Sequence, residues 1–327
     1  MRARTDTLRA RHGDRLVFRS QAALAAAGLA ATTGAVAAAA GSVHHAARGT
    51  HELVIAGQHF TYPAVNAAAG VLLGLATLGA VVLATALRAT WSQLRAYRSF
   101  VREIPVLGPL PEHPGVTVID DPSPQAFCAG YLRPRVYISS GALGLLADAE
   151  LTAVLSHEDR HRATRDPLRF ACARVLSQAL FFLPALRPLR DRYEQLAEQK
   201  ADEAAIHATG GEAGPLAAAL LTFDAATPPG VAGISNERVD SLLGQPSRWR
   251  LPSPLIALSM ATLVALVVLL WRTSAAASAH ATFNLPVLSS QPCMLVLALL
   301  PAAVILAACS WQRRLARPRR GLAVARA

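Results

Sequence analysis

Apolar positions in this sequence gather into long uninterrupted runs. The four longest contain no Asp, Glu, Lys or Arg and cover residues 21–41, 63–87, 254–271 and 292–311. A helix of about twenty apolar residues matches the hydrocarbon thickness of a bilayer, so the pattern predicts four transmembrane helices. The first run consists mostly of Ala and Gly, which leaves a cleaved signal peptide as an alternative for it.

The segment between the second and third runs has a different pattern, which predicts a mixed α+β domain. Short stretches that alternate or run apolar between turn residues indicate a small sheet at 115–119, 125–128 and 135–139. Helical spacing follows these stretches. One helix is expected from an N-cap at Asp148 to the residues before Pro167, and a second covers 191–203.

The apolar segment 168–189 could be mistaken for a fifth span. It contains Arg169 and Arg174 as well as Pro184 and Pro188, which weaken a transmembrane assignment. We expect a buried or membrane-grazing helix there instead. The fold class is therefore a mainly α membrane protein, in which four transmembrane helices flank an α+β domain with a small sheet.

Charge is segregated from the apolar runs and indicates their orientation. Hydrophobic residues make up 53% of the 327 residues, yet the formal net charge is +11. Arginines cluster in the N-terminal arm, after the second run and in the C-terminal tail, so these segments are expected on the cytoplasmic side. We expect a multi-pass protein of the cell membrane in three parts: an arm and transmembrane hairpin at 1–90, a cytoplasmic domain at 91–250, and a second hairpin with a basic tail at 251–327.

The same arginines indicate whether the protein binds membrane lipid or nucleic acid. They stand next to the apolar runs, where membrane topology and anionic headgroups explain them. The sequence contains no recognisable DNA-reading motif and no basic patch interleaved with aromatic residues. We therefore expect membrane lipid as a partner and expect no nucleic-acid binding.

The candidate chemistry lies on the first helix of the middle domain, in the stretch His157-Glu158-Asp159-Arg160-His161. Side chains four residues apart lie on one face of a helix, so His157 and His161 can bind one divalent metal while Glu158 points to the open coordination position. Zn²⁺ is the expected ion because imidazole nitrogen suits it. The neighbouring carboxylate can take a proton as a water attacks a peptide carbonyl. The motif therefore predicts metal-assisted hydrolysis of a peptide bond.

A catalytic zinc site also needs a third protein ligand. A metzincin would require Gly and His at positions where this chain has Thr164 and Pro167. On the second helix, Glu194, Glu198 and Asp202 recur every four residues on one face, and one of them is the expected ligand. The alternative is an exposed acidic stripe that pairs with nearby arginines.

Residues on both sides of the metal motif carry a family resemblance. His157-Glu158-x-x-His161 is followed about forty residues later by Glu198-x-x-x-Asp202, and it is preceded by related stretches at 125–130, 133–139 and 150–155. This order resembles the membrane-embedded gluzincin peptidases, including the BlaR/MecR antirepressor family and the related HtpX and CAAX prenyl endopeptidases. The resemblance implies a zincin-like middle domain with Glu198 as the third zinc ligand and Asp202 orienting a ligand histidine.

By this resemblance the protein is a zinc metalloendopeptidase with Glu158 as its catalytic residue and His157, His161 and Glu198 as its metal ligands. Its substrate is expected to be a cytosolic or membrane-associated protein or peptide, and the antirepressor branch suggests regulatory proteolysis. The alternative from another class is a non-catalytic membrane receptor or scaffold that retains the zinc-peptidase fold.

The strand expected at 125–128 has two interpretations. An exposed edge strand could hold an extended peptide by main-chain hydrogen bonds with its scissile carbonyl near the metal. An ordinary core strand would have no such role. The sequence does not distinguish the two.

Overall fold

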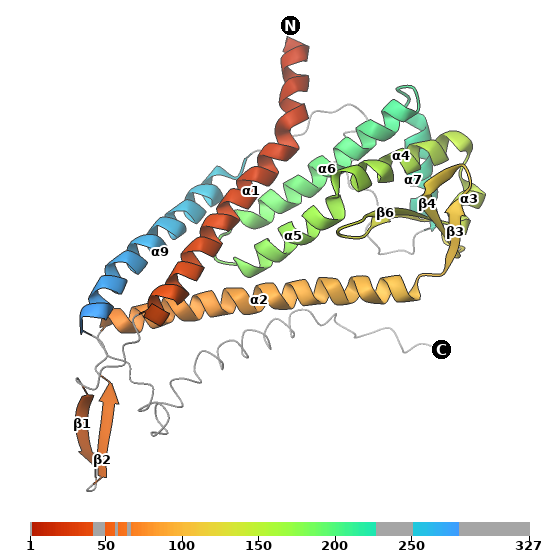
Figure 1. Ribbon diagram of the computed structural model, residues 1–327. Helices are drawn as coiled ribbons and strands as arrows, with labels where there is room; N and C mark the ends of the chain where they lie inside the picture. Colours follow the sequence, from red (N-terminus) through yellow and green to blue (C-terminus); the bar gives the residue numbers. More distant parts are fainter. Residues whose placement is uncertain (1, 42–49, 56–57, 64–66, 227–250, 281–327) are drawn as a thin grey trace, which may run out of the picture. The chain divides into compact units, whose positions relative to one another are not determined.

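The computed structural model describes residues 2–41, 50–55, 58–63, 67–226 and 251–280 (Figure 1). The chain divides into two compact units. Unit 1 comprises Met1–Ala23, Trp91–Ser177 and Ala185–Leu255, and unit 2 comprises Leu24–Thr90, Gln178–Pro184 and Ile256–Ala327. The protein is mostly helical, with a small mixed sheet.

Unit 2 holds most of the apolar helical residues. The long apolar helices are α1 (Arg2–Gly41), α2 (Ala67–Glu103) and α9 (Ser253–His280). Within them, three stretches are long and apolar enough to cross a membrane: Leu16–Gly41, Gly70–Glu103 and Ser253–Ser274. These stretches overlap the first three predicted spans. The fourth predicted span, 292–311, lies outside the described residues.

Small residues allow α1 and α2 to pack closely inside unit 2. A Cβ added at Gly79 would lie 2.8 Å from the backbone oxygen of Thr32 and 2.7 Å from the side chain of Val36. Both distances are too short for a real Cβ contact, so only glycine fits at this crossing without a shift of the backbone.

A two-stranded hairpin also belongs to unit 2. It consists of β1 (Thr50–Ile55) and β2 (Gln58–Pro63), which pair antiparallel. No secondary structure was predicted between the first two spans. The hairpin is therefore an element that the hydropathy pattern did not predict.

Unit 1 contains a four-stranded sheet in the order β3-β4-β6-β5. The strands are β3 (Val106–Leu110), β4 (His113–Ile119), β5 (Ala126–Ala129) and β6 (Arg135–Ser139). β4 and β6 run parallel, whereas the two outer pairs are antiparallel. The three segments expected as strands form β4, β5 and β6, and β5 lies at the edge of the sheet.

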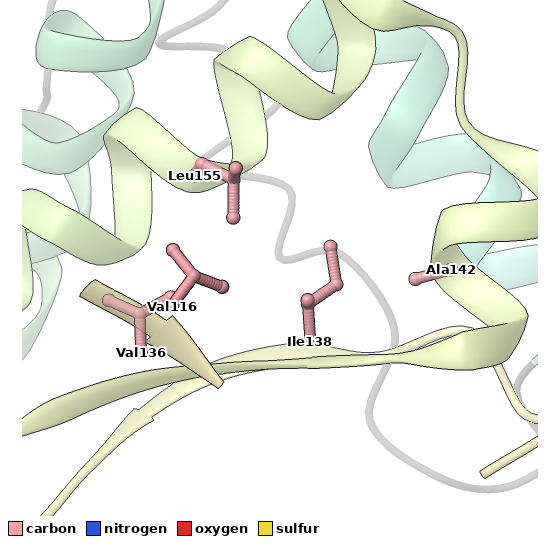
Figure 2. Close-up of a cluster of buried hydrophobic side chains, with 5 residues drawn as sticks. All are labelled: Val116, Val136, Ile138, Ala142 and Leu155. Carbon is pink, nitrogen blue, oxygen red and sulfur yellow. The ribbon is translucent and has the colours of Figure 1, made fainter. Parts of the chain in front are cut away.

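One face of this sheet packs against helices to form an apolar core. Figure 2 shows Leu155 of α4 (Asp148–Thr164) above Val116, Val136 and Ile138 of the sheet, with Ala142 of α3 (Ser140–Leu145) beside them. All five side chains are buried. Burial of each of the larger ones stabilises the fold by about 2 kcal/mol. The core thus fixes α4 over the sheet.

The other face of the sheet carries aromatic side chains. Tyr137 of β6 stacks on Phe127 of β5, with ring centroids 5.5 Å apart. Phe100, near the end of α2, meets both rings edge-on, at 5.5 Å from Phe127 and 5.9 Å from Tyr137. Side chains alternate between the two faces of a strand, so β6 can point Val136 and Ile138 toward α4 and Tyr137 toward α2.

The remaining helices of unit 1 surround α4. They are α5 (Asp166–Ala179), α6 (Leu186–Ala208) and α7 (Gly214–Ala226). α4 contacts α6, α7, β5 and β6, which makes it the central element of the unit. The segment 168–189 forms most of α5 and the start of α6 and is not among the candidate membrane spans of the described residues.

The start of α4 differs from the expected one. Asp148 is the first helical residue, and Ala147 occupies the N-cap position. The backbone N–H of Ala147 donates to the side chain of Glu150 at 3.1 Å. This bond is the half of a capping box in which the residue at N3 accepts from the N-cap backbone. The expected N-cap at Asp148 was therefore wrong by one residue.

Candidate metal centre

The two histidines of the motif lie on one face of α4. His157 and His161 are one helical turn apart, and each is only 6% exposed. Their Nε2 atoms are 3.2 Å from each other. The spacing of the motif thus brings two imidazole nitrogens to one point, as the sequence predicts.

Glu198 of α6 supplies a third donor beside them. Its two carboxylate oxygens lie 3.5 Å from Nε2 of His157 and 3.4 Å from Nε2 of His161. These three residues form a group whose ligand atoms all lie within 4.8 Å of one another. The two helices are separated in the sequence by α5. The group therefore forms only because α6 packs against α4.

Glu194 lies one turn earlier on α6 and is not part of the group. Its carboxylate lies 3.8 Å from Arg174 and 4.0 Å from Arg190. Burial raises the pKa of the Glu194 carboxyl above its usual range, and the two arginines oppose that rise. Glu194 thus pairs with arginines as the alternative expects, whereas Glu198 lies beside the two histidines.

Both histidines have a carboxylate behind them. Nδ1 of His157 lies 3.0 Å from Asp202, and Nδ1 of His161 lies 2.9 Å from Asp166. Both aspartates are buried, at 3% and 4% exposure. A carboxylate at this position favours a proton on Nδ1 and leaves the lone pair on Nε2. Two such lone pairs converge beside the Glu198 carboxylate, an arrangement that a cation would stabilise.

Asp166 and its partner Tyr193 were missed in the sequence analysis. Tyr193 donates its hydroxyl to Asp166 at 3.3 Å and is itself 2% exposed. Arg165 adopts a left-handed conformation at φ 55°, which ends α4 and turns the chain so that Asp166 meets the preceding turn of the helix. The signal in the sequence was an acidic residue directly before Pro167, at the start of a new helix.

The donor set fits a tetrahedral zinc ion. Zinc–nitrogen and zinc–oxygen bonds of about 2.0–2.1 Å require neighbouring ligand atoms to lie about 3.3 Å apart. The two Nε2 atoms are 3.2 Å apart, and each lies 3.4–3.5 Å from one of the two carboxylate oxygens of Glu198. Two imidazoles and one carboxylate also make up a common ligand set of catalytic zinc.

Glu158 lies next to this group but points to a different partner. Burial raises the pKa of its carboxyl above the usual range, while His157, His161 and a hydrogen bond from the Cys128 backbone N–H lower it. The Glu158 carboxylate of α4 thus lies close to the backbone of the edge strand β5. Burial also raises the pKa of the Cys128 thiol to about 12, and the Glu158 charge adds to that rise. Cys128 is therefore a neutral thiol at pH 7 and not a nucleophile.

A cavity of about 370 Å³ opens over the site. His157, Glu158, His161 and Glu198 line its polar part. The rest of its wall consists mostly of apolar residues from four elements, among them Phe127, Phe170, Leu216, Leu220 and Phe223. A concave, mostly apolar site with a few convergent polar groups is the usual form of a ligand-binding pocket.

Comparison with known families agrees with this geometry. Residues 98–213 match the family model described as peptidase family M48. The match covers His157, Glu158, His161 and Glu198, and it supports a zincin-type metallopeptidase. Peptidases of this family are generally zinc-dependent, in agreement with the donor set. No curated protein and no solved structure matches the chain.

Proposed function

We propose that this protein is an integral-membrane zinc endopeptidase that cleaves cytosolic or membrane-associated proteins. The observation that carries the proposal is the group formed by His157, His161 and Glu198, with Glu158 beside it in an open cavity. The family match supports the metallopeptidase class, and the apolar helices support a membrane protein. The distribution of arginines favours a site that faces the cytoplasm.

Each residue then has a defined role. His157, His161 and Glu198 hold the ion, and Asp202 keeps His157 in the orientation that presents Nε2. A bound zinc supplies Lewis acidity, which polarises a substrate carbonyl and acidifies water. Glu158 takes the proton of the attacking water and returns it to the leaving amine nitrogen. The raised pKa of its carboxyl makes Glu158 a better proton acceptor than an exposed glutamate.

The edge strand β5 is a candidate binding surface for an extended substrate, which would pair with it as an additional strand. Ser139 donates its backbone N–H to the Gln125 oxygen, whereas the Cys128 N–H points to Glu158. Backbone N–H and C=O groups alternate in direction along a strand. Those of Phe127 therefore point to β6, and those of Ala126 point to the free edge. Main-chain pairing at Ala126 and the Cys128 oxygen would lay a peptide beside Glu158. Regulatory proteolysis of a folded partner would require such an extended segment.

Replacement of Ala126 with Pro tests this pairing. Proline removes the outward N–H and leaves the inward ladder of β5 intact. We expect KM for a peptide substrate to rise by about twofold to tenfold, the value of one hydrogen bond, with a smaller change in kcat. Ala126→Val is the matched control. Equal KM values for the two variants would argue against main-chain pairing of the substrate with β5.

The decisive experiment is elemental analysis of zinc in the purified full-length protein. We expect roughly one zinc per chain in the wild type. Glu198→Ala should lose it, while Glu194→Ala should keep it because Glu194 pairs with arginines instead. A well-folded wild type without zinc would overturn the proposal.

Glu158→Gln separates the peptidase from a non-catalytic receptor or scaffold. This variant should keep its zinc and lose cleavage by about a hundredfold or more. A zinc-bearing wild type that cleaves no co-expressed or added protein, and that is indistinguishable from Glu158→Gln, would favour the scaffold.

A further inference from the structure

The apolar stretch of α2 and the polar residues that follow it form one uninterrupted helix. A helix rises 1.5 Å per residue, so about twenty residues from Gly70 onward are enough to cross the hydrocarbon region. The same helix continues to Glu103, which adds about 20 Å beyond the span. In a membrane that α2 crosses, residues from Trp91 onward would therefore lie within the headgroup region or close to it, on whichever side α2 emerges.

This part of α2 has two different faces. Tyr97 and Phe100 turn toward the sheet, where Tyr97 contacts Tyr131 with ring centroids 5.1 Å apart and Phe100 contacts the aromatic pair of β5 and β6. The other face contains Trp91, Arg95, Arg98 and Arg102, which follow one another at helical spacing and are all exposed.

The exposed face forms a basic hollow with an apolar rim. Its cavity of about 390 Å³ is lined by these four residues together with Leu94, Ser99 and Glu103. Trp91 is 62% exposed and Leu94 is 37% exposed, both on the side nearer the span. Three arginines and one glutamate give the hollow a formal charge of +2.

The arginines of the hollow are available to a ligand. Glu103 accepts a hydrogen bond from Ser99 at 2.5 Å. None of the ion pairs within the described part of the chain involves Arg95, Arg98 or Arg102. Guanidinium groups bind phosphate oxygens through parallel hydrogen bonds, and indole and leucine side chains suit the boundary between headgroups and acyl chains.

We propose that this basic hollow is a binding site for the headgroup of an anionic phospholipid in the membrane that α2 crosses. The three arginines pair with the phosphate and any further negative charge of the headgroup. Trp91 and Leu94 contact the upper part of the acyl chains. The site is separate from the metal centre, and its ligand class does not depend on the peptidase activity.

Lipid competition on the purified full-length protein tests the proposal. The protein is equilibrated in micelles that contain equal amounts of phosphatidylglycerol and phosphatidylcholine, and the bound lipids are counted by native mass spectrometry. We expect phosphatidylglycerol to be preferred, and each Arg→Gln change at 95, 98 or 102 to lower this preference about fivefold. Raised salt should weaken the preference of the wild type, because surface charges are screened.

The matched control carries the same loss of charge elsewhere in unit 1. Arg133, Arg135 and Arg187 are also exposed, and their triple Gln variant should keep the preference of the wild type. The proposal is overturned if the wild type shows no preference, if the triple variant of the hollow retains it, or if the control variant loses it equally. Competition by soluble glycerol phosphate at a similar concentration would point to a soluble phosphate ligand and would also overturn the lipid assignment.

Discussion

At the scale of single residues, the orientation of the two histidines depends on groups behind them. Asp202 comes from the same helix as Glu198, one turn later, whereas Asp166 comes from the start of α5. Asp166 is in turn held by Tyr193, and Phe170 packs edge-on against both His161 and Tyr193. His161 is thus fixed by a buried chain of contacts that runs from α4 through α5 to α6.

This chain of contacts predicts an effect on metal affinity. Asp166→Asn should lower the affinity for zinc by about tenfold to a hundredfold, because the amide is a weaker acceptor for the Nδ1 proton of His161. Tyr193→Phe should have a smaller effect, about twofold to tenfold, because it removes one hydrogen bond to the aspartate. Competition with a chromogenic zinc chelator measures both. Asp191→Asn, an exposed change on α6, is the control, and an affinity for Asp166→Asn equal to that of the control would contradict the prediction.

At the scale of elements, the aromatic face of the sheet connects α2 to the strand beside the metal centre. Phe100 contacts Phe127, and Cys128, the next residue of β5, lies beside Glu158 in the cavity wall. The same helix contains an apolar stretch long enough to cross a membrane. The position of β5 next to the site therefore depends on the packing of a helix that also contains a candidate membrane span.

Truncation of Phe100 tests this dependence. Phe100→Ala should reduce the free energy of unfolding by about 2 kcal/mol, since the side chain is half-buried and loses two ring contacts. It should also speed hydrogen exchange at the Phe127 and Cys128 amides more than elsewhere in unit 1. Hydrogen exchange with mass spectrometry measures the local effect, and Val101→Ala on the exposed side of α2 is the control. Unchanged exchange in β5 would show that Phe100 does not hold the strand.

At the scale of the whole molecule, the metal centre joins helices that are distant in the sequence. Its donors come from α4 and α6, and the carboxylates behind the histidines come from α5 and α6. Without a cation, the two Nε2 lone pairs and the Glu198 charge would repel one another. An ion at this point would therefore stabilise the arrangement of α4, α5 and α6.

Metal removal should accordingly destabilise the fold. A ligand at a hundred times its dissociation constant contributes about 2.7 kcal/mol, so treatment with a chelator should lower Tm by roughly 5 °C. Glu158→Gln should keep this shift and His157→Ala should lose it. A thermal scan of the full-length protein in detergent measures the change. The same chelator effect in both variants would mean that the ion binds elsewhere.

The sequence alone determined those features that depend on local spacing. Apolar runs predicted four spans, three of which overlap helices long and apolar enough to cross a membrane. The four-residue interval placed His157 and His161 on one face of a helix. Both features are readable because hydrophobic length and helical period are properties of neighbouring residues. It also indicated the three strands β4 to β6 of the small sheet. It did not distinguish Glu194, Glu198 and Asp202 by spacing, and only the resemblance to a family separated them.

The tertiary structure decided what depends on contacts between distant segments. The packing of α6 against α4 brings Glu198, and not Glu194, to the histidines, and a single left-handed residue at Arg165 returns Asp166 to His161. The edge position of β5 likewise follows from strand order, which the alternation of side chains cannot reveal. These features arise because packing selects one face of each helix and one order of strands from several that the local pattern allows.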